Sequence, residues 1–253
     1  MRLVEDGHLT IPLYHGTSTL FLDCIASSGL GGANSIEELR VPDAAIEVLK
    51  LADQFLENWT PFEQRRWAFT QMIEQKSSGW NWQHGDAYLS PSTMTAIRYA
   101  IGKEFGSEFL SYTMIFIEEM VRREIDEVIG GLYQQFPRLF QLLDVNPSPM
   151  LVKVNEIPID ALLSERGESA IPTLEELGQL TTGSVLNHEE GQQSNFRLQK
   201  PVPVHQLEFF LICVEKWDQY FPRYNLFRIE PDRVAQTNVE GNLIWIDHEV
   251  SER

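Results

Sequence analysis

Two apolar segments in the second half of the chain constrain its fold more than any other feature. Leu207 to Val214 is a largely apolar run, and Met150 to Val154 is similarly apolar and β-branched. Short segments of this kind, bounded by turn residues, are typical of buried strands. Leu243 to Ile246 has the same character and is expected to be the last strand. The second half is therefore predicted to supply most of the strands.

The first half carries helical signals instead. A helical region is expected from residue 35 to about residue 59, because Ser35 and Glu38 form a capping box, with an interruption near Pro42. A second helix is predicted to begin at Thr60, which is followed by a proline that suits the first helical position. Helices early and strands late indicate an α+β fold.

Glycines mark the end of the helical part. A further helix is expected from about residue 107 to residue 128, and the glycine pair at 130–131 is predicted to break it. We interpret residues 1–253 as a single domain. In this interpretation residues 35–78 form a helical insertion and residues 107–145 form a helical segment of that domain.

Charge and cysteine content narrow the classes of function. The formal net charge is −17, which argues against a broad basic surface for nucleic acid. Cys24 and Cys213 lie far apart, so neither a disulfide framework nor a cysteine metal site is expected, and no His and carboxylate grouping has metal-ligand spacing. The sequence shows no apolar signal core and no long apolar span. We expect a cytoplasmic protein without a membrane partner and without a metal.

Two short motifs carry candidate chemistry. Residues 11–15 are predicted to form a strand that ends at Gly16, within the segment Leu-Tyr-His-Gly-Thr-Ser. Some seventy residues later, Tyr88 opens a short strand, and the Ser90-Pro91 pair is expected to start a helix that carries Tyr99. Taken separately, the histidine could simply satisfy a turn, and the two tyrosines could be core aromatics.

In this order and spacing, the two motifs resemble those of the ADP-ribosyltransferase fold. The branch they resemble is the His-Tyr-Glu, poly(ADP-ribose)-polymerase-like one. The resemblance implies an α+β fold with a split β-sheet and inserted helices. It also implies that NAD is the substrate.

The resemblance assigns a role to each motif residue. In the family the histidine binds the adenosine ribose and the glycine offers its main chain to the nicotinamide carboxamide. The later tyrosine stacks on the nicotinamide ring, and the earlier one lines the same pocket. The family often has a small hydroxyl residue three positions before that later tyrosine, where this chain has an alanine with Thr95 and Ser92 nearby. The NAD-binding residues implied here are His15, Gly16, Thr17, Tyr88, Ser90 and Tyr99.

The family's catalytic glutamate has no direct counterpart. The closest local match to its strand is Asn-Phe-Arg-Leu, which puts Asn195 in the place of the glutamate, and Glu189 and Glu190 in the preceding loop are alternatives. His15, Tyr99 and Asn195 are the catalytic residues that the resemblance implies. Glu165 and Glu168 follow a predicted strand at residues 157–163, in a loop that could border the pocket, and solvated loop charge is the favoured interpretation of this pair.

The resulting hypothesis is a NAD-dependent mono-ADP-ribosyltransferase. It would cleave the nicotinamide–ribose bond and transfer ADP-ribose to a macromolecular acceptor, either protein or nucleic acid. Stand-alone transferases of this size resemble toxins of toxin–antitoxin or antiviral defence systems, which implies an antitoxin or regulatory partner. The alternative is a catalytically silent module of the same fold that binds NAD or a partner.

Overall fold

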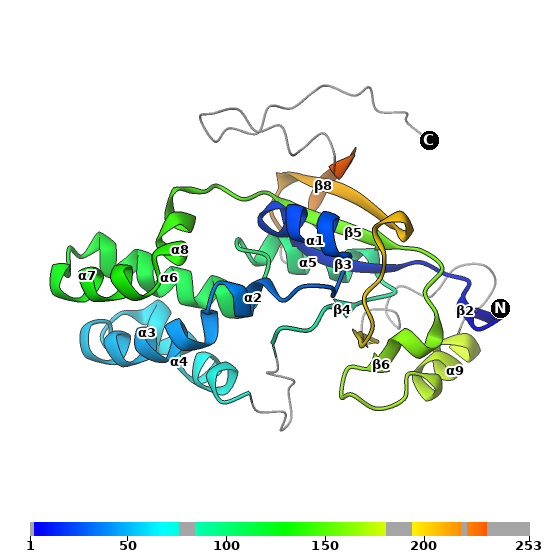
Figure 1. The fold of residues 1–253 in the computed structure, drawn as a ribbon, viewed down its shortest axis with the longest axis horizontal. Coiled ribbons are helices and arrows are strands. Elements are labelled where there is room, and N and C mark those ends of the chain that lie inside the picture. The colour runs from blue at the N-terminus through cyan, green and yellow to red at the C-terminus, as the bar shows by residue number, and fades with distance from the viewer. Residues whose placement is uncertain (1–2, 76–83, 181–193, 219–221, 232–253) are drawn as a thin grey trace. The chain divides into compact units, whose positions relative to one another are not determined.

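The computed structural model describes residues 3–75, 84–180, 194–218 and 222–231 and shows a mixed α+β architecture with several small sheets (Figure 1). The chain divides into two compact units. The sheet unit comprises Met1–Ala33, Ala87–Gly106 and Pro147–Arg253. The helical unit comprises Asn34–Asp86 and Ser107–Asn146. The described part of the chain contains no helix with the length and apolar character needed to cross a membrane.

The main sheet of the sheet unit has four antiparallel strands. In spatial order they are β3 (Leu13–Ser18), β5 (Pro149–Val154), β8 (Leu207–Lys216) and β9 (Arg223–Ile229). The two apolar segments that predict buried strands therefore form the two inner strands, β5 and β8. An inner strand is hydrogen-bonded to a neighbouring strand along each edge. Strands in the interior of a sheet are typically rich in apolar side chains, as these two segments are.

Two smaller sheets complete this unit. The first has the order β4 (Tyr88–Leu89), β7 (Phe196–Leu198) and β6 (Leu162–Ser164), all antiparallel. The second pairs β1 (Val4–Glu5) with β2 (His8–Leu9). An isolated bridge between Tyr14 and Ser90 links β3 to the end of β4. The predicted last strand at residues 243–246 lies outside the described residues.

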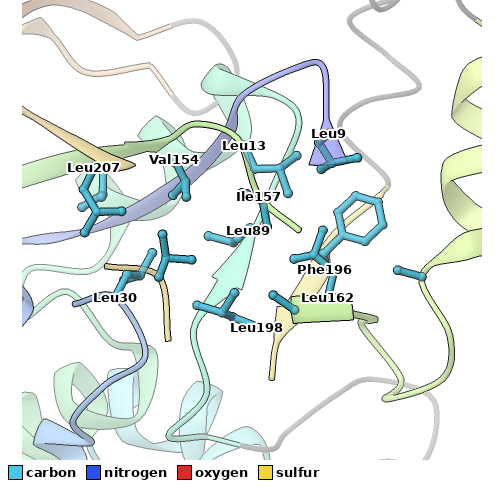
Figure 2. Close-up of a cluster of buried hydrophobic side chains, with 14 of the residues drawn as sticks. Leu9, Leu13, Leu30, Leu89, Val154, Ile157, Leu162, Phe196, Leu198 and Leu207 are labelled. Carbon is cyan, nitrogen blue, oxygen red and sulfur yellow. The ribbon is translucent and has the colours of Figure 1, made fainter. Parts of the chain in front are cut away.

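Side chains of the main sheet alternate between two hydrophobic clusters. On β5, Met150, Val152 and Val154 belong to a large cluster, whereas Leu151 belongs to a smaller one. The smaller cluster includes Ala96 and other residues of α5 (Thr93–Gly102), which packs on β3 and β5. The large cluster joins the main sheet to β4, β6 and β7, as the side chains of Leu13, Val154, Leu89, Leu162, Phe196 and Leu198 show in Figure 2.

The remaining helices of the sheet unit are short. They are α1 (Leu22–Ser28), α9 (Ile171–Leu180) and the single-turn 3₁₀ helices η1 (Thr19–Phe21), η3 (Ile159–Ala161) and η4 (Val204–Gln206). The predicted strand at residues 157–163 is thus mostly wrong, because η3 occupies its middle and only its end enters β6.

The helical unit is built around an aromatic core. Its elements are α2 (Ser35–Glu38), α3 (Val41–Phe55), α4 (Thr60–Ile73), α6 (Glu108–Arg122), α7 (Asp126–Gln135), α8 (Pro137–Gln141) and η2 (Leu142–Asp144). Phe62 and Phe69 of α4 each meet Phe116 of α6 edge to face, with ring centroids 5.1 Å apart. Edge-to-face contacts of this kind add to the burial of three large rings.

Two predicted helix boundaries are wrong for local reasons. Asn34, not Ser35, caps α2, since its Oδ1 accepts the N–H groups of residues 36 and 37. The predicted interruption near Pro42 is confirmed, because α2 ends at Glu38, Arg40 adopts the left-handed conformation, and α3 begins at Val41 with Pro42 in its first turn. The helix α7 runs through the glycine pair at 130–131, and the chain turns instead at Glu124, with φ of 56°.

His84 of the helical unit predicts a pH-dependent stability. Its ring stacks on Phe109 at 4.8 Å, and its buried Nε2 has no hydrogen-bond partner among the described residues. Burial lowers the pKa of His84 from 6.5 to about 4, against the opposing effect of Glu108. The unfolded state binds this proton near pH 6.5 and the folded state only near pH 4, so the stability is present above pH 6.5 and is lost as the pH falls.

We expect His84→Phe to remove this dependence, because phenylalanine keeps the stacked ring and does not titrate. Between pH 6.5 and pH 4 the native protein should lose up to about 3 kcal/mol of unfolding free energy relative to the variant. Urea denaturation of both proteins at several pH values in this window measures the difference. Parallel curves for the two proteins would contradict the assignment.

Candidate functional site

The His-Gly-Thr segment lies inside β3 rather than at a turn after it. His15 pairs with Val152 and Gly16 with Leu151, and the pairing continues to Ser18. The prediction that the strand ends at Gly16 is therefore wrong. The strand continues because β5 offers a full-length partner for residues 13–18.

Gly16 is the point where the strand touches a helix. A Cβ built on Gly16 would lie 1.9 Å from the carbonyl oxygen of Ala96 and 3.1 Å from the backbone nitrogen of Ala100. Both atoms belong to the backbone of α5, so neither can rotate away. The glycine allows α5 to pack directly on β3, and any side chain here would push the two elements apart.

The imidazole of His15 is held by the main chain of Tyr88. Nδ1 lies 2.9 Å from the Tyr88 carbonyl oxygen. A carbonyl only accepts, so Nδ1 carries the proton and donates it. Burial lowers the pKa of His15 below 6.5, although the bond to Tyr88 opposes this shift. At pH 7 the ring is therefore neutral and its Nε2 has a lone pair that accepts a hydrogen bond.

The edge of β3 next to β4 presents main-chain groups. Tyr14 N–H donates to the Ser90 carbonyl and Ser90 N–H donates to the Tyr14 carbonyl, both at 2.8 Å. Backbone groups alternate in direction along a strand, so Gly16, two residues further on, directs its amide and carbonyl at the same edge. Across that edge lies Tyr88, whose carbonyl is bound by the His15 ring. Among the described residues, the bridge that joins β3 to the end of β4 is the pair Tyr14 and Ser90.

Ser90 and Thr17 are buried, and each hydroxyl is hydrogen-bonded to a backbone group. The Ser90 Oγ accepts the N–H of Ser92 at 3.2 Å, and the Thr17 Oγ1 donates to the Gly106 carbonyl at 3.4 Å. Ser92 caps α5 by accepting the N–H of Thr95, so the helix begins two residues later than the Ser90-Pro91 pair predicts. These bonds give Ser90 and Thr17 a structural role.

Tyr99 lies at the border of the helix face that packs on the sheet. Its neighbours along that face, Ala96 and Ala100, are buried, whereas Tyr99 is 39% exposed. At the position where the family has a hydroxyl this chain has Ala96, but the preceding Thr95 has a buried Oγ1 without a partner among the described residues. A buried hydroxyl without a hydrogen bond is costly, which makes it a candidate contact for a ligand.

Asn195 immediately precedes β7, the middle strand of the small sheet. The register pairs Leu89 with Phe196 and Phe196 with Ser164. Continued by one residue, it sets Asn195 between Ser90 and Glu165. Asn195 Nδ2 donates to Glu165 Oε2 at 3.4 Å.

For Glu165, which is exposed, sequence reasoning weighed a place in a loop that borders the pocket and favoured solvated loop charge instead. Its interpretation as solvated loop charge rested on its local sequence, and no local signal shows that β6 and β7 pair. The pairing joins segments more than thirty residues apart, and only the tertiary structure shows it. Glu189 and Glu190, the other acidic candidates, lie outside the described residues.

The structure thus brings most of the predicted site residues together within the sheet unit. His15 contacts Tyr88, Gly16 contacts the helix that carries Tyr99, and Ser90 is joined to β3. Asn195 is set beside Ser90 by the strand register. No family model, no curated protein and no solved structure matches this chain.

Proposed function

We propose that this chain is a NAD-dependent mono-ADP-ribosyltransferase. The observation that carries the proposal is the arrangement around β3. The neutral His15 ring is bound to the Tyr88 carbonyl, and Gly16 on the same strand contacts the helix that carries Tyr99. Two segments from far along the sequence, β4 and α5, therefore contact the same strand, β3. Binding of a single dinucleotide requires several segments to meet in this way.

We assign the ribose, the carboxamide and the nicotinamide ring of NAD to different residues of the site. His15 Nε2 accepts a hydrogen bond from a ribose hydroxyl, because its other nitrogen already donates to Tyr88. The Gly16 amide and carbonyl are directed at the β4 side of β3, where they suit the complementary groups of a primary carboxamide. The partly exposed ring of Tyr99 stacks on the cationic nicotinamide, a contact that contributes about 1–2 kcal/mol.

The reaction needs stabilisation of positive charge more than proton transfer. When the bond between ribose C1′ and the nicotinamide nitrogen breaks, its electron pair leaves with nicotinamide, which becomes neutral. The ribose develops oxocarbenium character, as in glycoside cleavage. An acceptor nucleophile then bonds to C1′ and releases its proton. A carboxylate about 4 Å from this charge is worth about 4 kcal/mol at an effective dielectric of about 20.

The setting of this activity follows from the same proposal. The acceptor is a macromolecule, either protein or nucleic acid, and the net charge of −17 favours a basic protein. The absence of a glutamate at position 195 favours transfer of one ADP-ribose rather than chain elongation. By analogy with stand-alone transferases, we assign the chain to the cytoplasm, as a toxin or defence effector with an antitoxin or other regulatory partner.

The test is release of nicotinamide from NAD by the purified chain. We expect Tyr99→Ala to raise the KM for NAD about tenfold, because loss of stacking removes about 1–2 kcal/mol of binding. Tyr99→Phe should stay within about threefold of the native KM, since it keeps the ring. Tyr133→Ala is the matched control, because Tyr133 is an exposed tyrosine of the helical unit.

Calorimetry separates the transferase from a silent module. NAD binding without nicotinamide release, in the presence of protein and RNA acceptors, would support a binding module of the same fold. Equal KM values for Tyr99→Ala and the native chain would reject this site.

A further inference from the structure

The contact between Asn195 and Glu165 places a carboxylate where the resembling family has its glutamate. Asn195 immediately precedes β7, whose first residue, Phe196, pairs with Leu89, the residue before Ser90. Its Nδ2 donates to Oε2 of Glu165 from the neighbouring strand end, at 3.4 Å. Position 195 therefore supplies an amide that holds a carboxylate, in place of a carboxylate of its own.

The loop that carries Glu165 is closed by its own hydrogen bonds. Ser164 N–H donates to the Glu168 carbonyl at 2.8 Å, and Glu168 N–H donates to Ser164 Oγ at 3.1 Å. Gly167 N–H also donates to the Ser164 carbonyl at 2.9 Å. Glu165 is thus the first residue of a short loop with a defined backbone, and its exposed side chain extends from that loop.

Gly167 lets this loop pack on β7. Its φ of +84° lies in the left-handed region, and a Cβ there would lie 3.1 Å from Nη2 of Arg197. The Arg197 guanidinium therefore covers the loop at Gly167. This contact fixes the loop against the strand that Asn195 precedes.

Glu165 is held on the side of the small sheet that carries Tyr88. Phe196 and Leu198 of β7 are buried in the large cluster, so the alternate residues Asn195 and Arg197 take the opposite face. Tyr88 is paired directly with Arg197, and directly paired residues share a face. The Asn195 amide that contacts Glu165 is thus on the face of the Tyr88 side chain, whereas His15 bonds to the main-chain carbonyl of Tyr88.

We infer that Glu165 is the carboxylate that stabilises the reacting ribose, and that Asn195 is its positioning residue. The inference rests on the proposed function. As the C1′–nicotinamide bond breaks and its electron pair leaves with nicotinamide, the carboxylate faces the positive charge that develops on the ribose. With water as acceptor, a water oxygen bonds to C1′ and a proton passes to solvent, so that NAD and water yield ADP-ribose, nicotinamide and a proton.

The decisive comparison is Glu165→Gln against Glu168→Gln. Glutamine keeps an acceptor for Asn195 but removes the charge, so kcat for nicotinamide release should fall about 100-fold or more. The Kd for NAD should change less than about threefold, because the lost interaction acts mainly in the transition state. Glu168 lies in the same loop and is also exposed, and it contributes to the loop through its backbone. Glu168→Gln should therefore keep the native kcat.

A rescue variant distinguishes a catalytic charge from a structural contact. Asn195→Asp in the Glu165→Gln background restores one carboxylate to the same place. We expect it to recover at least about tenfold of the lost kcat, since the charge is needed and not the residue that carries it. Failure to recover, with both proteins folded by circular dichroism, would overturn the role of Asn195 and Glu165 as one unit.

The outcomes separate this inference from the proposed function. If the native chain releases nicotinamide and Glu165→Gln matches it, the role of Glu165 is overturned and the transferase stands. If the native chain releases none, both are overturned. A fall confined to Glu165→Gln, with NAD binding retained, supports both.

Discussion

Replacing Gly16 with alanine should strongly destabilise the sheet unit. The new Cβ would lie 1.9 Å from the Ala96 carbonyl oxygen, and that oxygen belongs to the backbone of α5. Since no rotamer relieves this contact, helix and strand must separate. We expect a loss of about 3 kcal/mol or more of unfolding free energy. For a chain of this size, this lowers the thermal midpoint by about 10 °C.

Gly102→Ala is the matched control for this substitution. Gly102 is the last residue of α5, and a Cβ there would meet nothing within 4 Å. Alanine is the better helix former, so stability should be unchanged or higher by up to about 1 kcal/mol. Thermal unfolding of the two variants side by side makes the comparison. Equal midpoints for Gly16→Ala and the native chain would show that α5 does not pack on β3 as described.

Loss of the His15 ring should be the most damaging change to nicotinamide release apart from loss of the carboxylate. His15→Ala removes the proposed acceptor for the ribose hydroxyl and the hydrogen bond from the ring to the Tyr88 carbonyl. Each unsatisfied polar group costs about 1–3 kcal/mol. We therefore expect kcat/KM for NAD to fall about 100-fold.

His8→Ala controls for loss of a histidine elsewhere in the same unit. His8 is exposed on β2, and its Nδ1 contacts a backbone oxygen two residues away. Its removal should leave kcat/KM unchanged. An equal fall in both variants would show a general effect on the fold rather than a role in the site.

The pH profile gives a second readout of His15. Burial lowers the pKa of His15 below 6.5, so the neutral acceptor form persists to a lower pH than in a free histidine. Protonation then removes the Nε2 lone pair, and kcat/KM should fall on the acid side, with its midpoint below pH 6.5. A midpoint at or above 6.5 would show that another group controls the profile.

Some parts of the fold can be predicted from the local sequence because they arise from the properties of a few consecutive residues. The apolar run at residues 207–214 forms the inner strand β8, and Thr60 with the proline after it begins α4. Burial of an apolar strand and a proline in the first turn need no information from distant segments. Helix ends are less predictable, because adjacent polar residues compete for the cap, as Asn34 and Ser35 do.

In the candidate site, too, some features can be predicted from the sequence and others depend on the tertiary structure. The sequence by itself determined which chemical groups are available, namely an imidazole, a bare glycine backbone, two tyrosines and an amide at position 195. Only the tertiary structure decided that His15 lies inside a strand, because that depends on β5 as a partner. It also decided that Glu165 lies beside Asn195, because β6 and β7 pair across more than thirty residues of chain. Hydrogen bonds between strands depend on which segments meet, and a local pattern does not encode that meeting.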